Sequence, residues 1–187
     1  MIMLSKRIRK VGLVQMRTKD VIQSLVGTKK MVVKDFFLEA ETNAFVIAAR
    51  PTKTEQCRCS RCHCKAKYYD GGRGARRWRT LDIGSSKAFV EASAPRVCCK
   101  KHGVVVADVP LARLNSRFCK AFEEQVTWLV THTSRSVVSE LMRIEWHTVG
   151  DVCTRVYKDL ESGTTSRFDG LVNIGIDETS YKKVISI

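Results

Sequence analysis

Cysteine and histidine side chains are concentrated between residues 57 and 103, which hold six of the eight cysteines and two of the four histidines. In two pairs the members are separated by two residues, and this spacing lets a tight turn aim both side chains at one tetrahedral ion. Gly103, directly after the second pair, supports this register because such a turn commonly passes through a residue with positive φ. The expected chemistry is structural zinc binding. The four expected ligands are Cys59, Cys62, Cys99 and His102.

Two other interpretations of these side chains stay open. They could be free buried thiols of a reduced protein, or Cys57, Cys64 or Cys98 could supply a ligand instead. Clustered cysteines without a secretory signal favour a reducing cytoplasm and a metal over disulfides, and a secreted disulfide domain is the weaker alternative. The apolar runs are far shorter than the roughly 18 residues of a spanning helix, so we expect no membrane partner.

Positive charge is concentrated in two segments of this basic chain. The net charge is +14, and residues 1–30 carry eight Lys and Arg against one acid, while residues 58–101 carry twelve against three. Such charge beside a zinc knuckle predicts binding to a nucleic-acid phosphate backbone, with strong salt dependence. A merely soluble basic surface explains it less well, because four arginines and Trp78 fall in one Gly-rich loop. These candidate contacts are Arg73, Arg76, Arg77 and Arg79.

The first 55 residues divide into an arm and a hairpin. Residues 1–30 begin as a basic arm without a clear period, and Thr18 can cap a short helix that Gly27 ends. A transit peptide or an amphipathic anchor is the alternative, although the Ser-rich, uniformly amphipathic character is missing. Residues 31–55 contain two β-branched and aromatic runs around a polar turn, which predicts a β-hairpin. The expected apolar stripe of the helix is Val21, Ile22, Leu25 and Val26.

The zinc module is expected to cover residues 56–112. Between the two ligand pairs, residues 76–83 and 87–93 predict two strands joined by a turn, and residues 96–99 extend a third. Residues 104–109 form the last extended piece. A sheet this small cannot bury enough apolar surface alone, so a metal is expected to pin its strand ends, as in a zinc ribbon.

A change of apolar period to about 3.6 predicts three helices within residues 113–169. Ser116 and Ser134 are candidate N-caps of the first two helices, and the third covers residues 146–160. The tight second turn and the adjacent basic module favour a helix-turn-helix over another three-helix bundle. The second helix is expected to point Val137, Val138 and Leu141 inward. The third would read DNA through His147, Thr148, Asp151 and Arg155.

An apolar strand ending in an acidic pair occupies the last segment, residues 170–187. Several nucleases begin their catalytic sheet in this way, because the strand holds a carboxylate rigidly for Mg²⁺. Many strands also end in Asp or Glu as turn formers, so the motif alone is weak. Asp177 and Glu178 are adjacent and their side chains alternate between faces, so both cannot line one metal pocket.

A series of short motifs runs through the chain in the order Cys-x-x-Cys, Arg-Arg-Trp-Arg-x-Leu-Asp, Pro-Arg-Val-x-Cys-x-x-His-Gly-Val, Leu-Met-Arg-Ile-x-Trp-x-Thr-Val-Gly and Ile-Gly-Ile-Asp-Glu-x-Ser-Tyr-Lys-Lys. As a series, it resembles the N-terminal part of the ISL-three family of bacterial insertion-sequence transposases. The resemblance implies a zinc finger, a helix-turn-helix that binds terminal inverted repeats in double-stranded DNA, and a ribonuclease-H-like domain with an Asp-Asp-Glu metal triad. Carried over by position, the zinc ligands fall on the four residues named above and the first catalytic acid on Asp177.

Two departures from the family pattern matter. Glu145 stands where the family has a small polar residue at the start of the third helix, which weakens the cap. The family continues after Tyr-Lys-Lys into a long catalytic domain, whereas this sequence ends at Ile187. Two-metal strand transfer needs carboxylates from several segments. We therefore expect a truncated, catalytically incompetent remnant, with Mg²⁺ bound only in a full-length homologue.

The expected fold class is α+β, with a β-rich zinc-ribbon-like module, a three-helix domain and one orphan strand. The expected function is that of a DNA-binding portion of a transposase in DNA transposition, located at the nucleoid in the cytoplasm. Its partners would be DNA and either a second copy or a full-length transposase. Two alternatives stay open: a free-standing zinc-binding helix-turn-helix transcriptional regulator, and an active nuclease that takes its other acids from another chain. The orphan strand favours the remnant, because a regulator should end after the third helix.

Overall fold

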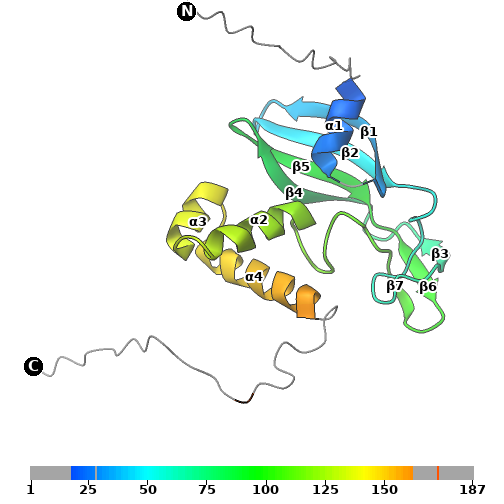
Figure 1. Cartoon of the computed structure of the whole chain (residues 1–187). Coiled ribbons are helices and arrows are strands. Elements are labelled where there is room, and N and C mark those ends of the chain that lie inside the picture. Colours follow the sequence, from blue (N-terminus) through cyan, green and yellow to red (C-terminus); the bar gives the residue numbers. More distant parts are fainter. Residues whose placement is uncertain (1–17, 28, 162–171, 173–187) are drawn as a thin grey trace, which may run out of the picture.

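The computed structural model describes residues 18–27, 29–161 and 172, and these residues form two sheets and four helices (Figure 1). A four-stranded sheet with one helix across it occupies the upper part of that view, and a small three-stranded sheet lies beyond its lower right end. The other three helices lie below the large sheet. The predicted α+β class is confirmed. Within the described ranges, no helix is long and apolar enough to cross a membrane.

The first helix and hairpin are α1 (Thr18–Val26), β1 (Met31–Glu39) and β2 (Ala44–Pro51). The side chains of Ile22 and Val26 on α1 are buried in the core of the large sheet. The predicted apolar stripe is only half right, because one short helix turns a single narrow face to a sheet. The two stripe residues that remain exposed are Val21 and Leu25.

The large sheet joins segments that the sequence suggested were separate. Its strand order is β1-β2-β5-β4, with β4 at Ala75–Ile83 and β5 at Ser86–Ser93. Strand β2 pairs in parallel with β5, placing Ile47 opposite Val90. A lone two-stranded hairpin is marginally stable, and this pairing buries both of these side chains. The hairpin of residues 31–55 is therefore not a unit of its own, and β4 and β5 belong to this sheet although they lie between the two zinc knuckles in sequence.

The small sheet contains β3 (Lys67–Asp70), β6 (Arg96–Cys99) and β7 (Gly103–Val106), with β6 in the centre. Strand β3 was not predicted. Strand β7 ends at Val106, earlier than expected, because the backbone N–H groups of the next two residues donate to carbonyls outside its pairing with β6. The N–H of Ala107 donates to the carbonyl of Pro95 at 2.7 Å, and the N–H of Asp108 donates to the carbonyl of Arg58 at 2.8 Å.

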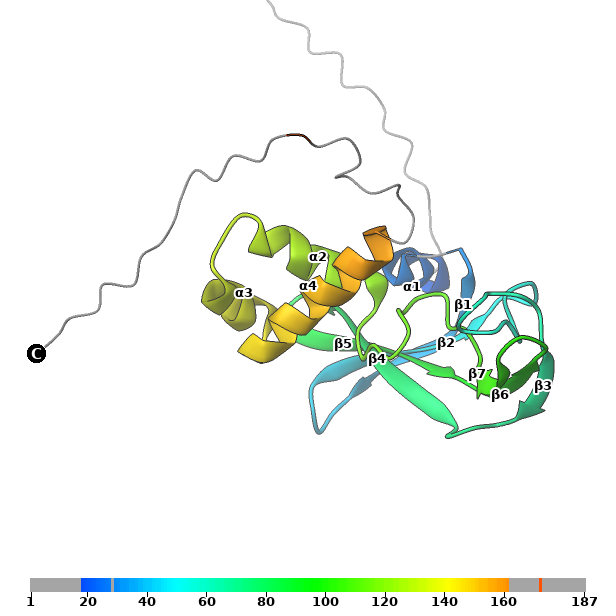
Figure 2. The same ribbon diagram turned by 90° about the horizontal axis from the view of Figure 1, so that it is seen from below.

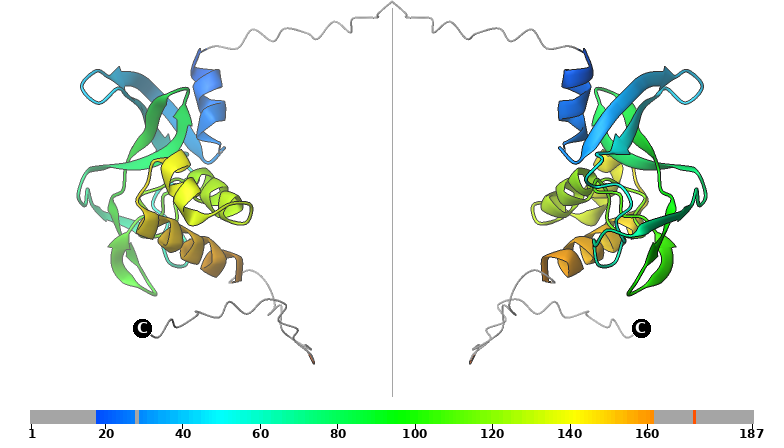
Figure 3. Two further views of the ribbon diagram at one scale, coloured as in Figure 1. Left: turned by 90° about the vertical axis from the view of Figure 1, so that its left-hand side faces the viewer. Right: turned by 90° about the vertical axis from the view of Figure 1, so that its right-hand side faces the viewer.

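The three predicted helices are α2 (Lys120–Val130), α3 (Arg135–Met142) and α4 (Trp146–Glu161). They pack around a second apolar cluster that includes Phe122 and Val149, both almost fully buried. Helix α2 contacts both β4 and α4. Figures 2 and 3 show α2 and α4 next to each other on the same side of the large sheet, seen from below and from the sides.

Two details of the helical part differ from the sequence-based expectation. Helix α2 begins after Cys119, not at Ser116, whose hydroxyl bonds instead to the main chain of Phe118 and to the buried carboxylate of Glu123. On α3, the N-cap Ser134 is confirmed, since its side chain accepts from the N–H of Val137. The inward face of α3 is rotated from the predicted one: Val138 and Met142 are buried, whereas Val137 and Leu141 are about half exposed or more.

Candidate metal centre and nucleic-acid interface

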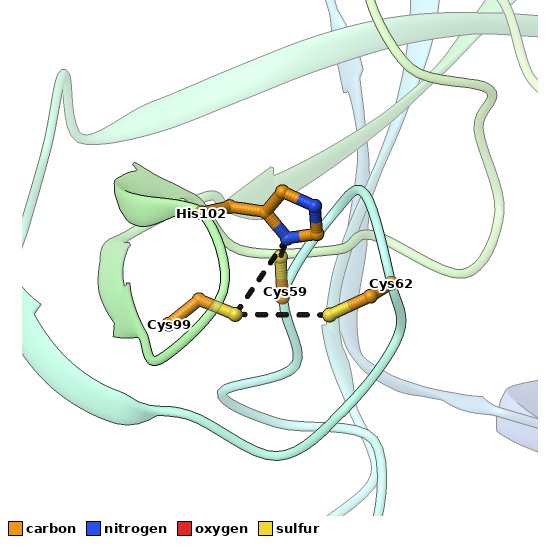
Figure 4. A group of neighbouring side chains, drawn as sticks. All are labelled: Cys59, Cys62, Cys99 and His102. Atoms are coloured by element: carbon orange, nitrogen blue, oxygen red, sulfur yellow. Dashed lines mark hydrogen bonds between the residues drawn. The ribbon is translucent and has the colours of Figure 1, made fainter.

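The two ligand pairs predicted from spacing converge on one point between the first knuckle and the β6–β7 turn (Figure 4). The Cys59 sulfur lies 3.5 Å and the Cys99 sulfur 3.7 Å from Nδ1 of His102, and the Cys62 and Cys99 sulfurs lie 3.7 Å apart. All four ligand atoms lie within 4.8 Å of one another. Zinc bond lengths of about 2.0–2.3 Å imply tetrahedral edges of roughly 3.3–3.8 Å, so three of these separations fit such an ion closely.

Both knuckles turn through a residue in the left-handed conformation. Gly103 has φ of 65° and His63, at the equivalent place after the first pair, has φ of 55°. The N–H of His63 donates to the carbonyl of Cys59 at 2.9 Å, which closes the first turn. Nδ1 of the His63 ring lies 3.2 Å from a carboxylate oxygen of Asp108. This side-chain contact, which glycine could not make, helps to support the left-handed backbone at His63. The same turn geometry is therefore reached with two different residue types.

Local hydrogen bonds prepare the sulfurs unequally for metal. The pKa of Cys99 is lowered to about 6, chiefly because the backbone N–H of Lys101 donates to its sulfur. Burial raises the pKa of Cys59, whose side chain is fully buried. The backbone N–H of Arg61 donates to the Cys59 sulfur at 3.4 Å and partly offsets this effect. Among the described residues, these four side chains form the one group of three or more that could hold a metal ion. The alternative ligands lie outside it: Cys57, Cys64 and Cys98.

The four arginines predicted to share one exposed loop do not. Arg73 lies in the turn before β4, and the other three lie on β4 itself. Arg76 is exposed, with its guanidinium 5.3 Å from the centre of the Trp78 ring. Arg77 pairs with Glu39 at 3.1 Å and with Glu91 at 2.8 Å. The predicted loop was too long because the glycines of residues 71–74 suggested that it continued past Gly74. The strand β4 begins at Ala75.

Arg79 is buried and joins the sheet to the helical part. Its guanidinium pairs with Asp82 at 2.8 Å and donates to the carbonyl oxygens of Met142 and Arg143, each at 3.4 Å. Arg143 in turn pairs with Asp82 and donates to the carbonyl of Ser85 at 3.0 Å. We call Arg79, Asp82 and Arg143 the clamp. Because Arg79 is committed to these contacts, its prediction as a phosphate ligand is wrong.

The clamp holds the turn between α3 and α4. Arg143 is the C-cap of α3 and has a left-handed backbone with φ of 52°, and its N–H donates to the carbonyl of Glu140 at 3.1 Å. Outside glycine, this conformation costs about 1 kcal/mol or more and needs support from surrounding contacts. The clamp supplies that support from the β4–β5 hairpin. It therefore fixes where α4 starts relative to the large sheet.

The predicted reading residues of α4 fall into two groups. His147 and Asp151 are exposed and Thr148 is half-buried, near the start of the helix. Arg155 lies two turns further on, and its Nε is 2.9 Å from a carboxylate oxygen of Glu123. That carboxylate is fully buried and also binds Arg113 at 3.1 Å. Arg155 is thus part of an internal network and not a free cation.

Sequence reasoning did not find the internal contacts of this network and of the clamp, although it had named Arg79 and Arg155 for DNA binding. Glu123 stands on the apolar face of α2, one position after Phe122, and a carboxylate there needs a buried partner. That was the available signal, but nothing local identified Arg113 or Arg155 as the partners. Arg113 also binds Glu124 at 3.2 Å and Asp159 at 2.9 Å, so it ties the segment before α2 to both α2 and α4.

Two family models match this chain in succession. Residues 55–102 match the zinc-finger of transposase IS204/IS1001/IS1096/IS1165, and residues 107–157 match the helix-turn-helix domain of transposase family ISL3. This chain contains the zinc-finger and helix-turn-helix domains of ISL3 transposases. The metal-ligand cluster lies within the first match and the α2–α4 unit within the second.

Two relatives found by sequence comparison are transposases. The chain is 44% identical over 173 residues to the transposases for insertion sequence element IS1557 from two Mycobacterium tuberculosis strains, CDC 1551 / Oshkosh and ATCC 25618 / H37Rv. Each alignment covers 90% of this chain and 39% of the relative. No solved structure gives a significant match. The predicted catalytic Asp177 and the strand of residues 170–187 fall outside the residues that can be described, apart from Val172.

Proposed function

We propose that this chain is the DNA-binding portion of an insertion-sequence transposase, with α4 as the reading helix and the zinc module as its basic support. The observation that carries the proposal is the α3–α4 turn. It presents the exposed first turn of α4, including His147, and the clamp fixes it to the large sheet, whose strand β5 is followed in the chain by β6 and the ligand Cys99. A reading helix enters the major groove with its N-terminal residues toward the base edges.

The metal we assign to the cluster is zinc, held by Cys59, Cys62, Cys99 and His102. Four protein ligands complete a tetrahedron and leave no open position, so the ion has a structural role. When bound, it ties the first knuckle to the β6–β7 turn and supplies cohesion that a sheet of four-residue strands lacks. The ligands come from both ends of the 55–102 match, so the ion closes that module.

For the DNA contacts, we assign base reading to His147, Thr148 and Asp151 and backbone contact to Arg73 and Arg76. Arg77 and Arg155 are held in ion pairs, so we assign them no direct contact with DNA. From the resemblance of the sequence motifs, the target we assign is the terminal inverted repeat of an insertion element, bound in the cytoplasm at the nucleoid. A second copy or a full-length transposase would be the protein partner. Asp177 as a Mg²⁺ ligand in such a longer protein stays a prediction from resemblance.

The test is selection of bound duplexes from a random-sequence pool by the zinc-loaded chain, followed by binding measurements on the winning sequence. We expect His147→Ala with Thr148→Ala to reduce the preference for the selected sequence over a scrambled one by at least tenfold, since a good base contact contributes about 1–3 kcal/mol. His132→Ala is the matched control, because His132 is exposed at the end of α2 and away from α4's first turn.

Two outcomes would count against this proposal. A chain that selects no common sequence, or variants of α4 that keep the full preference, would remove α4 as the reading element. Selected sequences that occur at promoters and not at the ends of an insertion element would favour the transcriptional regulator instead. In either case the metal content of the chain is measured alongside, so that a misfolded preparation is recognised.

A further inference from the structure

A groove of about 340 Å³ is lined both by residues of the zinc module and by residues outside it. Its walls come from three places: the first knuckle, the middle of β4, and the segment from β7 to residue 116. Apolar side chains also line it, including the buried Trp78 and Val109. The reading helix contributes no residue to its lining, so the groove is separate from the base-reading face of α4, although it includes Arg76.

The charged side chains of the groove are mostly arginines. Arg61 comes from the knuckle, Arg76 from β4, Arg96 from β6 and Arg113 from the segment before α2. The one lining carboxylate is that of Asp108, which already faces the ring of His63 at 3.2 Å. The lining therefore has four arginines and one carboxylate before the ion pairs of these arginines are considered.

Two of these arginines are not committed to internal contacts. Arg96 is neutralised by a two-point ion pair with Asp70, and Arg113 is held by Glu123, Glu124 and Asp159. By contrast, no carboxylate among the described residues pairs with Arg61 or Arg76, and both are exposed. Stacking on Trp78 holds the guanidinium of Arg76 in place at the groove without neutralising it.

The metal cluster sets the position of Arg61. This residue lies between the ligands Cys59 and Cys62, and its N–H donates to the Cys59 sulfur at 3.4 Å. Its backbone is therefore fixed by the same turn that binds the ion. A side chain that starts from such a turn loses less freedom when it binds a ligand, and an arginine fork matches the geometry of a phosphate.

We propose that this groove binds the phosphate backbone of duplex DNA through Arg61 and Arg76, as a second, sequence-independent contact beside the helix that reads the bases. The inference rests on the proposed function. Duplex DNA is favoured over a small anion because the two free cations come from different lining segments, the first knuckle and β4, and because the surrounding segment, residues 58–101, carries twelve Lys and Arg against three acids. An extended polyanion matches charge that is spread in this way.

The experiment measures binding of zinc-loaded chain to a labelled mixed-sequence duplex as salt is varied. Each phosphate contact contributes about 0.9 to the slope of log K against log salt, so Arg61→Ala with Arg76→Ala should lower the slope by about 2. The loss of affinity should be equal for mixed and selected sequences, because backbone contacts carry no sequence information. Arg61→Lys with Arg76→Lys should keep most of the slope, since it keeps both charges.

The control is Lys34→Ala with Lys53→Ala, which removes the same charge from exposed positions on β1 and in the turn after β2, outside the groove and outside both basic segments. We expect its slope to stay within about 0.5 of the parent, as no phosphate contact is lost. If the parent binds DNA and the groove variant keeps the parental slope, the groove is not a backbone site and the inference alone fails. If the parent binds neither duplex, the proposed function fails with it. Full zinc content in the groove variant excludes a folding defect as the cause of its loss.

Discussion

Glu123 is the residue whose environment departs most from its type. Its carboxylate is fully buried on the core side of α2, and it accepts from Arg113, Arg155 and the hydroxyl of Ser116 at 2.7–3.1 Å. Each of these partners lies outside α2: Arg113 and Ser116 precede it in the chain, and Arg155 lies on α4. One buried carboxylate thus connects the segment that leaves the zinc module with the helix assigned to read DNA.

We predict that Glu123→Gln lowers the free energy of unfolding by about 3 kcal/mol, because it leaves two largely buried guanidinium groups without their shared anion. Urea unfolding of the zinc-loaded chain measures this loss. Glu124→Gln is the matched control: the same arginine contacts Glu124, but this side chain is 60% exposed, so the loss should be at most about 1 kcal/mol. Equal effects of the two substitutions would show that burial does not set the strength of this network.

The secondary-structure elements followed from local patterns, whereas their pairing did not. Alternating apolar residues located β1, β2, β4 and β5, and helical spacing located the four helices to within a few residues. The parallel pairing of β2 with β5 brings together residues more than forty positions apart, which no local period encodes. Strand β3 was missed because all four of its residues are polar or aromatic and three are exposed, so it carries no apolar alternation.

The candidate site divides in the same way. The metal cluster could be predicted because its two pairs have fixed short spacing and each forms within one turn. The roles of Arg79 and Arg155 could not, because an arginine that binds a buried partner and one that binds DNA look identical in sequence. Their partners lie 3–64 positions away and are found only once the fold is known.

At the scale of elements, the clamp makes the β4–β5 hairpin a support for the α3–α4 turn. We predict that Asp82→Asn, which removes the shared anion of Arg79 and Arg143, increases hydrogen exchange of the amides at residues 142–145 and weakens sequence-specific DNA binding more than non-specific binding. Loss of a buried ion-pair partner typically costs about 3–5 kcal/mol, part of which would appear as local opening of this turn.

Glu41→Gln serves as control for the clamp, since it removes a carboxylate from the exposed turn between β1 and β2. It should leave exchange in the α3–α4 turn unchanged. Unchanged exchange in Asp82→Asn as well would mean that the helical part holds its own turn and that the hairpin contributes nothing to the position of α4.

At the scale of the whole molecule, the described part of the chain contains two apolar clusters that share no residue with the metal cluster. One lies between α1 and the large sheet and the other within α2–α4. The small sheet contributes to neither cluster, although Val97 and two of the metal ligands, Cys59 and Cys99, are buried. We therefore expect the small sheet to depend on the metal for its cohesion, whereas the helical part has a core of its own.

This arrangement leads to a prediction about metal removal. We expect about one zinc per chain, retained in Cys64→Ser with Cys98→Ser and lost in Cys59→Ser with Cys99→Ser, as metal analysis of the purified variants would show. The first pair is the matched control, because it removes two cysteines from the same module but none of the four converging ligands.

On chelation, amides of β3, β6 and β7 should lose protection from hydrogen exchange, since little apolar surface remains to hold them. Amides buried in α2 and α4 should stay protected, because their cluster includes Phe122, Val126 and Val152 and no metal ligand. If the helices lost protection together with the small sheet, the two parts would form one cooperative unit and the separation argued from the clusters would be wrong.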